Sequence, residues 1–253
     1  MSSRILNWFK FSSPATFYPL AGKIQKAAAL VAVVLLAVGL YMSFFVAPTD
    51  YKQGEGYRII FIHVPAAWMS MFIYVVMAFW AAMGLVFGTR LSFMMARALA
   101  PTGALMTFIA LWTGAFWGKP MWGAWWVWDA RLTSELILFF LYIGYIALQG
   151  AIPDLRRGDR AGAILLLVGV VNIPIIYFSV KWWNTLHQGA SVSITKGSSM
   201  STIMLETMLL MTIAFWAYAI AVAMARVRLI ILERERGTRW VQELPEVRGA
   251  WTK

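Results

Sequence analysis

The sequence predicts an all-α integral membrane protein, a bundle of six transmembrane helices with a tryptophan-rich loop on its outer face. Of its 253 residues, 61% are hydrophobic and only 13% are charged, whereas a soluble domain carries about a quarter charged residues. This composition leaves too little polar surface for a water-soluble globule, so it excludes a cytosolic enzyme and a disordered chain. The absence of cysteine excludes disulfides, iron–sulfur clusters and thiolate sites.

Six apolar stretches approach or exceed the roughly 20 residues that a helix needs to cross the hydrocarbon core. They cover residues 24–46, 59–87, 91–116, 132–151, 161–180 and 200–225. The connections between them are short, which favours an up-and-down bundle. Asn172 and Pro174 interrupt the fifth stretch and predict a local kink. A charged leader without a clear cleavage site precedes the first stretch, so we expect this helix to be retained as an anchor.

Lysine and arginine predict the orientation of the bundle. Sixteen of these 22 residues fall in the terminal tails and the even-numbered connections, and six fall in the odd-numbered connections. Because positively charged connections remain in the cytoplasm, we expect both termini there. The chain then divides into a cytoplasmic or interfacial tail (1–23), a transmembrane domain (24–225) and a basic cytoplasmic tail (226–253). The net charge of +11 therefore reports topology and not nucleic-acid binding.

The third connection, residues 117–131, concentrates tryptophan on the outer side. It contains Trp117, Trp122, Trp125, Trp126 and Trp128, and the fifth connection adds Trp182 and Trp183. Half of the chain's 14 tryptophans therefore lie on two short connections. An aromatic belt is one interpretation, but a belt is shared between both membrane faces. Crowding on one loop favours a flat aromatic platform for a flat apolar ligand.

His63 and His187 are the only histidines, and the topology places both on the outer side. One histidine at a membrane edge is more often a hydrogen-bonded structural residue than a ligand. Two of them beside a tryptophan platform favour axial ligands of heme iron, because neutral imidazole binds iron well. Zinc fits poorly, since its sites take three or four ligands that this sequence does not cluster.

Charged residues near this loop are further candidates. Arg58 and Arg131 could each pair with a heme propionate through the guanidinium fork, although arginine at a helix end also extends to lipid headgroups. Asp129 precedes an expected helix, so we expect it to cap that helix or to pair with Arg131. Glu135 and Glu206 fall within spans, where ionisable groups face the bundle interior or a partner.

The tryptophan loop also carries a family resemblance. The run W-G-A-W-W-V-W-D from Trp122 to Asp129, continued by A-R-L-T-S, resembles the signature of the heme-handling proteins of cytochrome c maturation. Among these, a six-span chain with one histidine on either side of the loop resembles the CcmC (heme exporter protein C) family. The run H-V-P-A-A-W at His63 and the run W-W-N-T-L-H-Q-G that contains His187 also match it. The resemblance covers roughly residues 24–240.

The resemblance implies a cargo and a set of partners. Such proteins present heme b (iron protoporphyrin IX) at the periplasmic face of the bacterial inner membrane and load it onto the periplasmic heme chaperone CcmE. They work in an ABC-type complex with the ATPase CcmA, the membrane subunit CcmB and the small single-span protein CcmD. Matched by position, the axial ligands would be His63 and His187, and Arg58 and Arg131 would contact propionates. The heme platform and chaperone dock would consist of Trp122, Trp125, Trp126, Trp128 and Asp129.

Other functions remain open at this stage. The sequence has no phosphate-loop, H-E-x-x-H or G-x-S-x-G motif, so we expect a heme-handling transporter subunit without catalytic residues. One alternative is a b-type heme subunit for electron transfer, although such proteins usually place both histidines inside the bilayer. A second is an anchoring subunit without a ligand, in which both histidines are replaceable. A permease would show polar or broken helices in matching halves.

Overall fold

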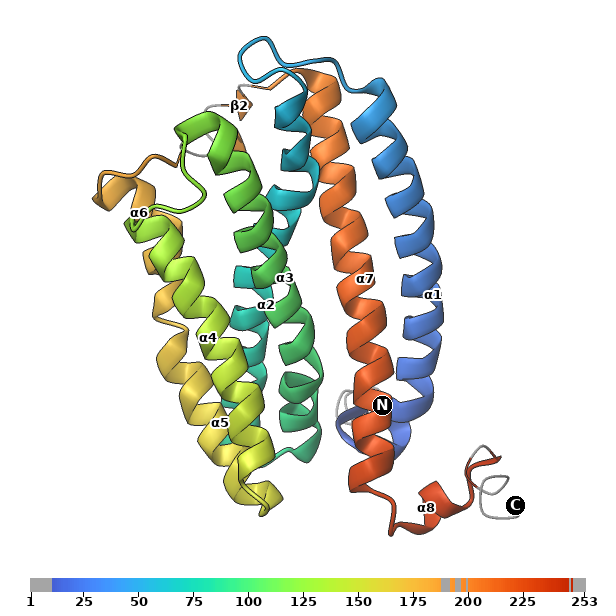
Figure 1. The fold of residues 1–253 in the computed structure, drawn as a ribbon. Coiled ribbons are helices and arrows are strands. Elements are labelled where there is room, and N and C mark those ends of the chain that lie inside the picture. The colour runs from blue at the N-terminus through green and yellow to red at the C-terminus, as the bar shows by residue number, and fades with distance from the viewer. Residues whose placement is uncertain (1–10, 188–191, 194–196, 199, 246, 248–253) are drawn as a thin grey trace, which may run out of the picture.

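The computed structural model describes residues 11–187, 192–193, 197–198, 200–245 and 247. Six helices in this part of the chain are long and apolar enough to cross a membrane, which confirms the predicted fold class. Among these residues the only strands are the short antiparallel pair β1 (Val192–Ser193) and β2 (Gly197–Ser198). The helices run side by side, and α1 begins at the same end of the bundle as α7 finishes (Figure 1). Of the charges counted for the orientation, those at positions 4, 10, 196, 248 and 253 lie outside the described residues.

The spans are built from the following elements: α1 (Pro14–Tyr41) continued by the π-helical turn η2 (Met42–Val46); the 3-10 turn η3 (Glu55–Ile59) continued by α2 (Ile60–Phe87); α3 (Arg90–Trp122); α4 (Ala130–Ala151); α5 (Leu155–Gly169) followed by α6 (Asn172–Trp182); and α7 (Thr202–Arg234). A short helix, α8 (Arg239–Gln242), follows α7.

The kink predicted in the fifth span is confirmed as a break between α5 and α6. Pro174 has no N–H to donate to the preceding turn, so the helical ladder is interrupted here. The buried amide of Asn172 donates to the carbonyl of Ser134 in α4 at 2.9 Å. A neighbouring helix therefore supplies hydrogen bonding next to the break, as a broken helix in a membrane requires.

Two helices are longer than the apolar stretches indicate. α1 begins at Pro14 and not near residue 24, and α7 continues to Arg234 and not to residue 225. The two extensions pack against each other along the blue and orange-red helices of Figure 1. Arg228 donates to the hydroxyl of Tyr18 at 3.0 Å and lies over its ring at 4.5 Å. Hydropathy assigned these polar residues to tails, but they remain helical because they bind one another.

Ion pairs join the helices at this end of the bundle. The guanidinium of Arg234 donates two hydrogen bonds, of 2.8 and 2.9 Å, to the carboxylate of Asp159 in α5, and both side chains are buried. Arg90 at the start of α3 pairs with Glu235 at 2.9 Å. The end of α7 is therefore attached to α5 by charge-assisted hydrogen bonds and to the start of α3 by an ion pair.

Close packing between α3 and α4 positions a series of buried hydrogen bonds that leads toward the other end of the bundle. Gly103 lies so near Tyr142 that a Cβ atom there would be 2.2 Å from the tyrosine ring. The Tyr142 hydroxyl donates to the carbonyl of Ser70 at 2.7 Å, and the Ser70 hydroxyl donates to Glu135 at 2.7 Å. Because Gly103 has no side chain, Tyr142 can take the position from which these hydrogen bonds start.

We predict that Gly103→Ala destabilises the protein by about 1–3 kcal/mol, because the added methyl group forces Tyr142 to move. The matched control is Gly150→Ala in α4, where an added Cβ meets nothing within 4 Å. Thermal unfolding followed by tryptophan fluorescence in detergent measures both variants. A Gly103→Ala variant as stable as the control would contradict this packing argument.

Candidate functional site

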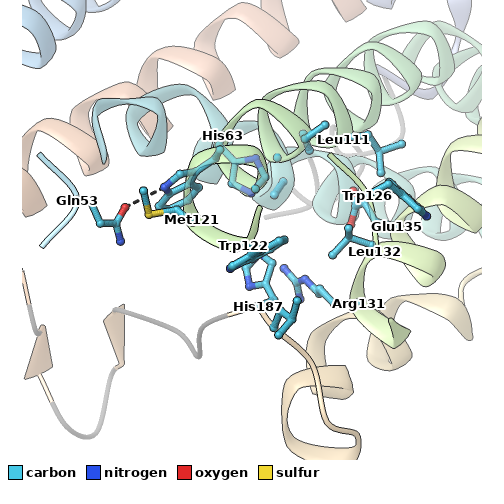
Figure 2. A pocket seen from close by; sticks show the side chains of 17 residues that line it. Gln53, His63, Leu111, Met121, Trp122, Trp126, Arg131, Leu132, Glu135 and His187 are labelled. Atoms are coloured by element: carbon cyan, nitrogen blue, oxygen red, sulfur yellow. Dashed lines mark hydrogen bonds between the residues drawn. The ribbon is translucent and has the colours of Figure 1, made fainter. Parts of the chain in front are cut away.

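A cavity of about 240 Å³ lies where the start of α2, the end of α3, the start of α4 and the segment after α6 meet (Figure 2). This is the end of the bundle away from the start of α1 and the end of α7 (Figure 1). Its wall is mostly apolar, and its polar and aromatic lining consists of Gln53, His63, Trp117, Trp122, Trp126, Arg131, Glu135 and His187. Five of the nine residues predicted for the site therefore line one cavity.

The structure brings the two histidines together although they are far apart in the sequence. Their ring centroids are 6.3 Å apart, and the ring planes are inclined by 31°. Two imidazoles bound on opposite sides of one metal ion through nitrogens at about 2 Å would have centroids about 6 Å apart. The observed separation therefore fits two ligands of a shared ion.

Thr113 fixes the ring of His63. His63 lies in the first turn of α2, and its Nδ1 is 3.0 Å from the hydroxyl of Thr113 in α3. That hydroxyl has one hydrogen, which it donates to the carbonyl of Ile109 at 2.6 Å. It therefore accepts a hydrogen bond from the Nδ1–H of His63. In this tautomer Nε2 carries the lone pair, so Nε2 is the nitrogen that can bind a metal.

His187 is held by two consecutive hydrogen bonds that connect it to Asp129 at the start of α4. The backbone N–H of His187 donates to the hydroxyl of Thr185 at 3.0 Å, and this hydroxyl donates to the carboxylate of Asp129. The other carboxylate oxygen of Asp129 accepts the N–H of Leu132 at 2.8 Å, which confirms Asp129 as the helix cap. One carboxylate therefore both starts α4 and positions the segment that carries His187.

Two tryptophans contact the histidines from α3. This helix continues to Trp122, six residues beyond the predicted end of the span. Trp117 packs edge-on to His63 at 5.7 Å, and Trp122 packs against His187 at 6.2 Å. The helix ends at Gly123, whose φ of 75° suits only glycine comfortably. Residues expected in a loop are therefore presented on a rigid helical turn.

The remaining tryptophans of the loop divide between the cavity and the surface. Trp126 lines the cavity, whereas Trp125 and Trp128 lie outside its wall and are 53% and 76% exposed. Trp126 packs against Trp128 at 5.4 Å, so the aromatic surface continues from the cavity to the exterior.

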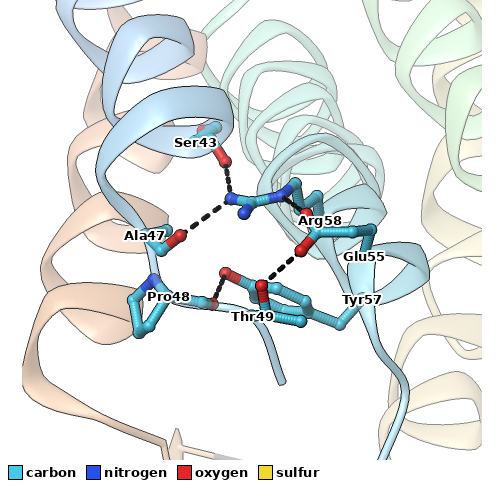
Figure 3. Close-up of polar contacts among 7 residues, drawn as sticks. All are labelled: Ser43, Ala47, Pro48, Thr49, Glu55, Tyr57 and Arg58. Carbon is cyan, nitrogen blue, oxygen red and sulfur yellow. Dashed lines mark hydrogen bonds and ion pairs between the residues drawn. The ribbon is translucent and has the colours of Figure 1, made fainter. Parts of the chain in front are cut away.

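The two candidate arginines have different surroundings. Arg131 lines the cavity and donates to the carbonyl of Ile176 in α6 at 2.7 Å. Arg58 is not part of the cavity wall. Figure 3 shows its contacts with the end of the first span. Its Nη1 donates to the carbonyls of Ser43 and Ala47 at 2.6 and 3.0 Å, and its Nε pairs with Glu55. The guanidinium of Arg58 thus satisfies carbonyls at the end of the first span.

Three further polar residues support the cavity: Glu135, which was expected to face the bundle interior or a partner, and Gln53 and Thr113, which the sequence patterns did not single out. Glu135 lies buried in the cavity wall, where Oε1 accepts from Ser70 and Oε2 has no hydrogen-bond partner among the described residues. Gln53 accepts from the indole N–H of Trp117 at 2.8 Å. Neither Gln53 nor Thr113 belongs to a motif that could have marked it. Glu206 is exposed on α7, so it does not face the bundle interior, and its contact with a partner stays a prediction.

Comparison with known proteins places these features in a family. The family described as "CcmC: Heme exporter protein C" matches residues 7–242. Heme exporter protein C of Escherichia coli K12 is 48% identical over 236 residues, which cover 93% of this chain and 95% of the relative. The Bradyrhizobium diazoefficiens protein of that name is 49% identical over 223 residues, covering 88% and 84%. A Marchantia polymorpha protein named "Putative cytochrome c biosynthesis ccmC-like mitochondrial protein" is 48% identical over 182 residues, covering 72% and 77%.

We predict that Asp129→Ala loosens the segment that carries His187. The variant loses a helix cap worth about 1 kcal/mol and also the acceptor for Thr185. The chain has no cysteine, so Leu186→Cys carries the only spin label, and its spectrum should show greater mobility when Asp129 is replaced.

The control for this variant is Asp154→Ala, which removes the corresponding cap from α5. This second substitution should leave the label at position 186 unchanged. Unchanged mobility in the Asp129→Ala protein would show that the hydrogen bonds through Thr185 and Asp129 do not hold the segment.

Proposed function

Because the chain belongs to the heme exporter protein C family and so has a role in heme handling for cytochrome c biogenesis, we propose that it binds heme b through His63 and His187 and delivers it to the periplasmic heme chaperone CcmE. The observation that carries this proposal is the approach of the chain's only two histidines across one cavity, with ring centroids 6.3 Å apart.

The chemistry of the cavity suits this cargo. Two neutral imidazoles supply both axial ligands of heme iron. Thr113 holds the His63 ring in the tautomer that exposes Nε2, and a hydrogen bond of this kind also raises the basicity of the ligand. The indoles of Trp117 and Trp122 lie against the two histidines and offer apolar faces to the macrocycle.

Charge supports the placement of the propionates at Arg131. This side chain lines the cavity, and its hydrogen bond to the carbonyl of Ile176 uses Nη1 alone, while a guanidinium has five N–H donors. A carboxylate can therefore be bound in the bidentate geometry that arginine favours. Arg58 already binds two carbonyls and Glu55. We therefore propose that it holds η2 in place and does not bind a propionate.

The size of the cavity supports delivery as opposed to storage. At about 240 Å³ it is smaller than the roughly 300–1,000 Å³ typical of sites that enclose a ligand of drug size. The macrocycle would be enclosed along one edge, with the opposite edge open to a chaperone. Trp125 and Trp128, exposed just outside the cavity, form the docking surface in this proposal.

The proposal also covers the orientation of the chain in the membrane and its partner proteins. Both termini lie in the cytoplasm of a bacterial inner membrane, which exposes the cavity to the periplasm, because sixteen of the 22 lysines and arginines fall on the side of the termini. The chain has no ATPase motif. It therefore works with the ATPase CcmA, the membrane subunit CcmB and the small protein CcmD, which couple release of the loaded chaperone to ATP hydrolysis.

The absorption spectrum of the full chain, purified after coexpression with the chaperone, tests this function. We predict a low-spin spectrum with two histidine ligands, which His63→Ala and His187→Ala each abolish or convert to high spin. Heme bound unchanged in both variants would contradict the proposed site, and a wild-type chain that never binds heme would favour an anchoring subunit.

Thr113→Val tests the positioning of His63 separately from its ligation. We predict about tenfold weaker heme retention, the scale of loss when a group that orients a metal ligand is removed, while the bound fraction stays low-spin. Thr113→Ser keeps the hydroxyl and should restore retention. If Thr113→Ser binds heme as weakly as Thr113→Val, the hydroxyl is not the group that matters.

A further inference from the structure

A second cavity, of about 420 Å³, lies between α3, α4 and α7 at the end of the bundle remote from the histidines. Two arginines line it, Arg97 from the third turn of α3 and Arg226 from α7. Much of the remaining wall is aliphatic and includes Ile146 and Leu229, which are exposed on the outside of the bundle. The cavity therefore combines a cationic centre with walls that are continuous with the lipid-facing surface.

The charge of this cavity is not balanced by the residues that line it. Arg97 makes no hydrogen bond or ion pair with another described residue, and Arg226 donates to the neutral hydroxyl of Thr102 at 2.8 Å. No aspartate or glutamate lines the cavity. Arg234, at the same end of the bundle, instead has a carboxylate partner. Since charged groups in membrane proteins are normally paired, two arginines without a carboxylate in the cavity wall favour a bound anion.

The positions of the two arginines along their helices give their depth. α3 and α7 each contain 33 residues and are therefore about 50 Å long, whereas the hydrocarbon core is about 30 Å thick. About 10 Å of each helix end thus extends beyond the core. Arg97 lies seven residues, about 10 Å, from the start of α3, and Arg226 lies eight residues, about 12 Å, from the end of α7. Both guanidiniums are therefore at the depth where acyl chains meet phosphate groups.

We propose that this cavity binds an anionic phospholipid of the leaflet on the side of the termini, with its phosphate between Arg97 and Arg226 and an acyl chain along Ile146 and Leu229. Two guanidiniums are suited to a phosphate because each can donate paired hydrogen bonds. Heme is the poorer fit, since no histidine, cysteine or methionine lines the cavity to bind its iron and the one tyrosine in its wall, Tyr145, is buried. The lipid joins α4 to α7 at the end where those helices enclose the cavity.

Native mass spectrometry of the full chain tests this proposal, with dioleoylphosphatidylglycerol and dioleoylphosphatidylcholine added in equal amounts to delipidated protein. We expect the wild type to retain the anionic lipid preferentially. Arg97→Gln should reduce that preference about fivefold, the effect of one cation near the membrane surface. Arg97 has no hydrogen-bonded partner among the described residues that would be left unsatisfied, so we expect this substitution to spare folding. Arg156→Gln, an exposed arginine at the same end, is the matched control and should retain the preference.

Three results would overturn the proposal. The first is an equal preference for phosphatidylglycerol in Arg97→Gln and in the wild type. The second is loss of the preference in Arg156→Gln to the same extent, which would show a general effect of surface charge. The third concerns protein extracted directly from membranes: an adduct of heme mass or of polypeptide mass, present in the wild type and lost in Arg97→Gln, would identify a different occupant.

Discussion

The packing of α2 against α3 is the constraint on which the rest of the site depends. His63 is buried between these helices because Gly114 has no side chain, and a Cβ at that position would lie 3.1 Å from the imidazole. The Thr113 hydroxyl then binds Nδ1 and leaves Nε2 as the nitrogen that carries the lone pair. His187, in contrast, is held by hydrogen bonds of a connecting segment. One proposed ligand is therefore part of the helical core, and the other belongs to a connecting segment held by Thr185 and Asp129.

This asymmetry has a functional meaning. A carrier must bind its cargo firmly and still release it, and the two requirements are easier to satisfy on separate elements. α2 and α3 provide a fixed ligand and a fixed aromatic wall, whereas the segment after α6 is attached to α4 through Asp129 and Thr185. At the other end of the bundle, the ion pair of Arg234 with Asp159 holds α7 to α5. The bundle is thus also held together at the end remote from the cavity.

The sequence predicted the architecture better than the details of the site. Six apolar stretches, the break at Asn172 and the cap at Asp129 follow from hydropathy, proline and helix-cap chemistry, which are local properties. The convergence of His63, His187, Trp122, Trp126 and Arg131 on one cavity followed from topology and family resemblance together. The roles of Thr113, Gln53 and Arg58 could not be predicted, because they depend on which helix turns lie opposite each other. The extents of α1 and α7 were missed for a related reason: hydropathy cannot register that Arg228 and Tyr18 bind each other.

The central claim is that both histidines ligate one heme, and electron–nuclear double resonance of the ferric protein tests it most directly. The chain has only two histidines, so uniform ¹⁵N-histidine labelling marks the two proposed ligands and no other side chain. The account predicts hyperfine couplings from two ¹⁵N imidazole nitrogens in the wild type, and from one in a His187→Ala protein that still holds heme. A heme-loaded wild type that shows coupling to one histidine or to none would contradict it.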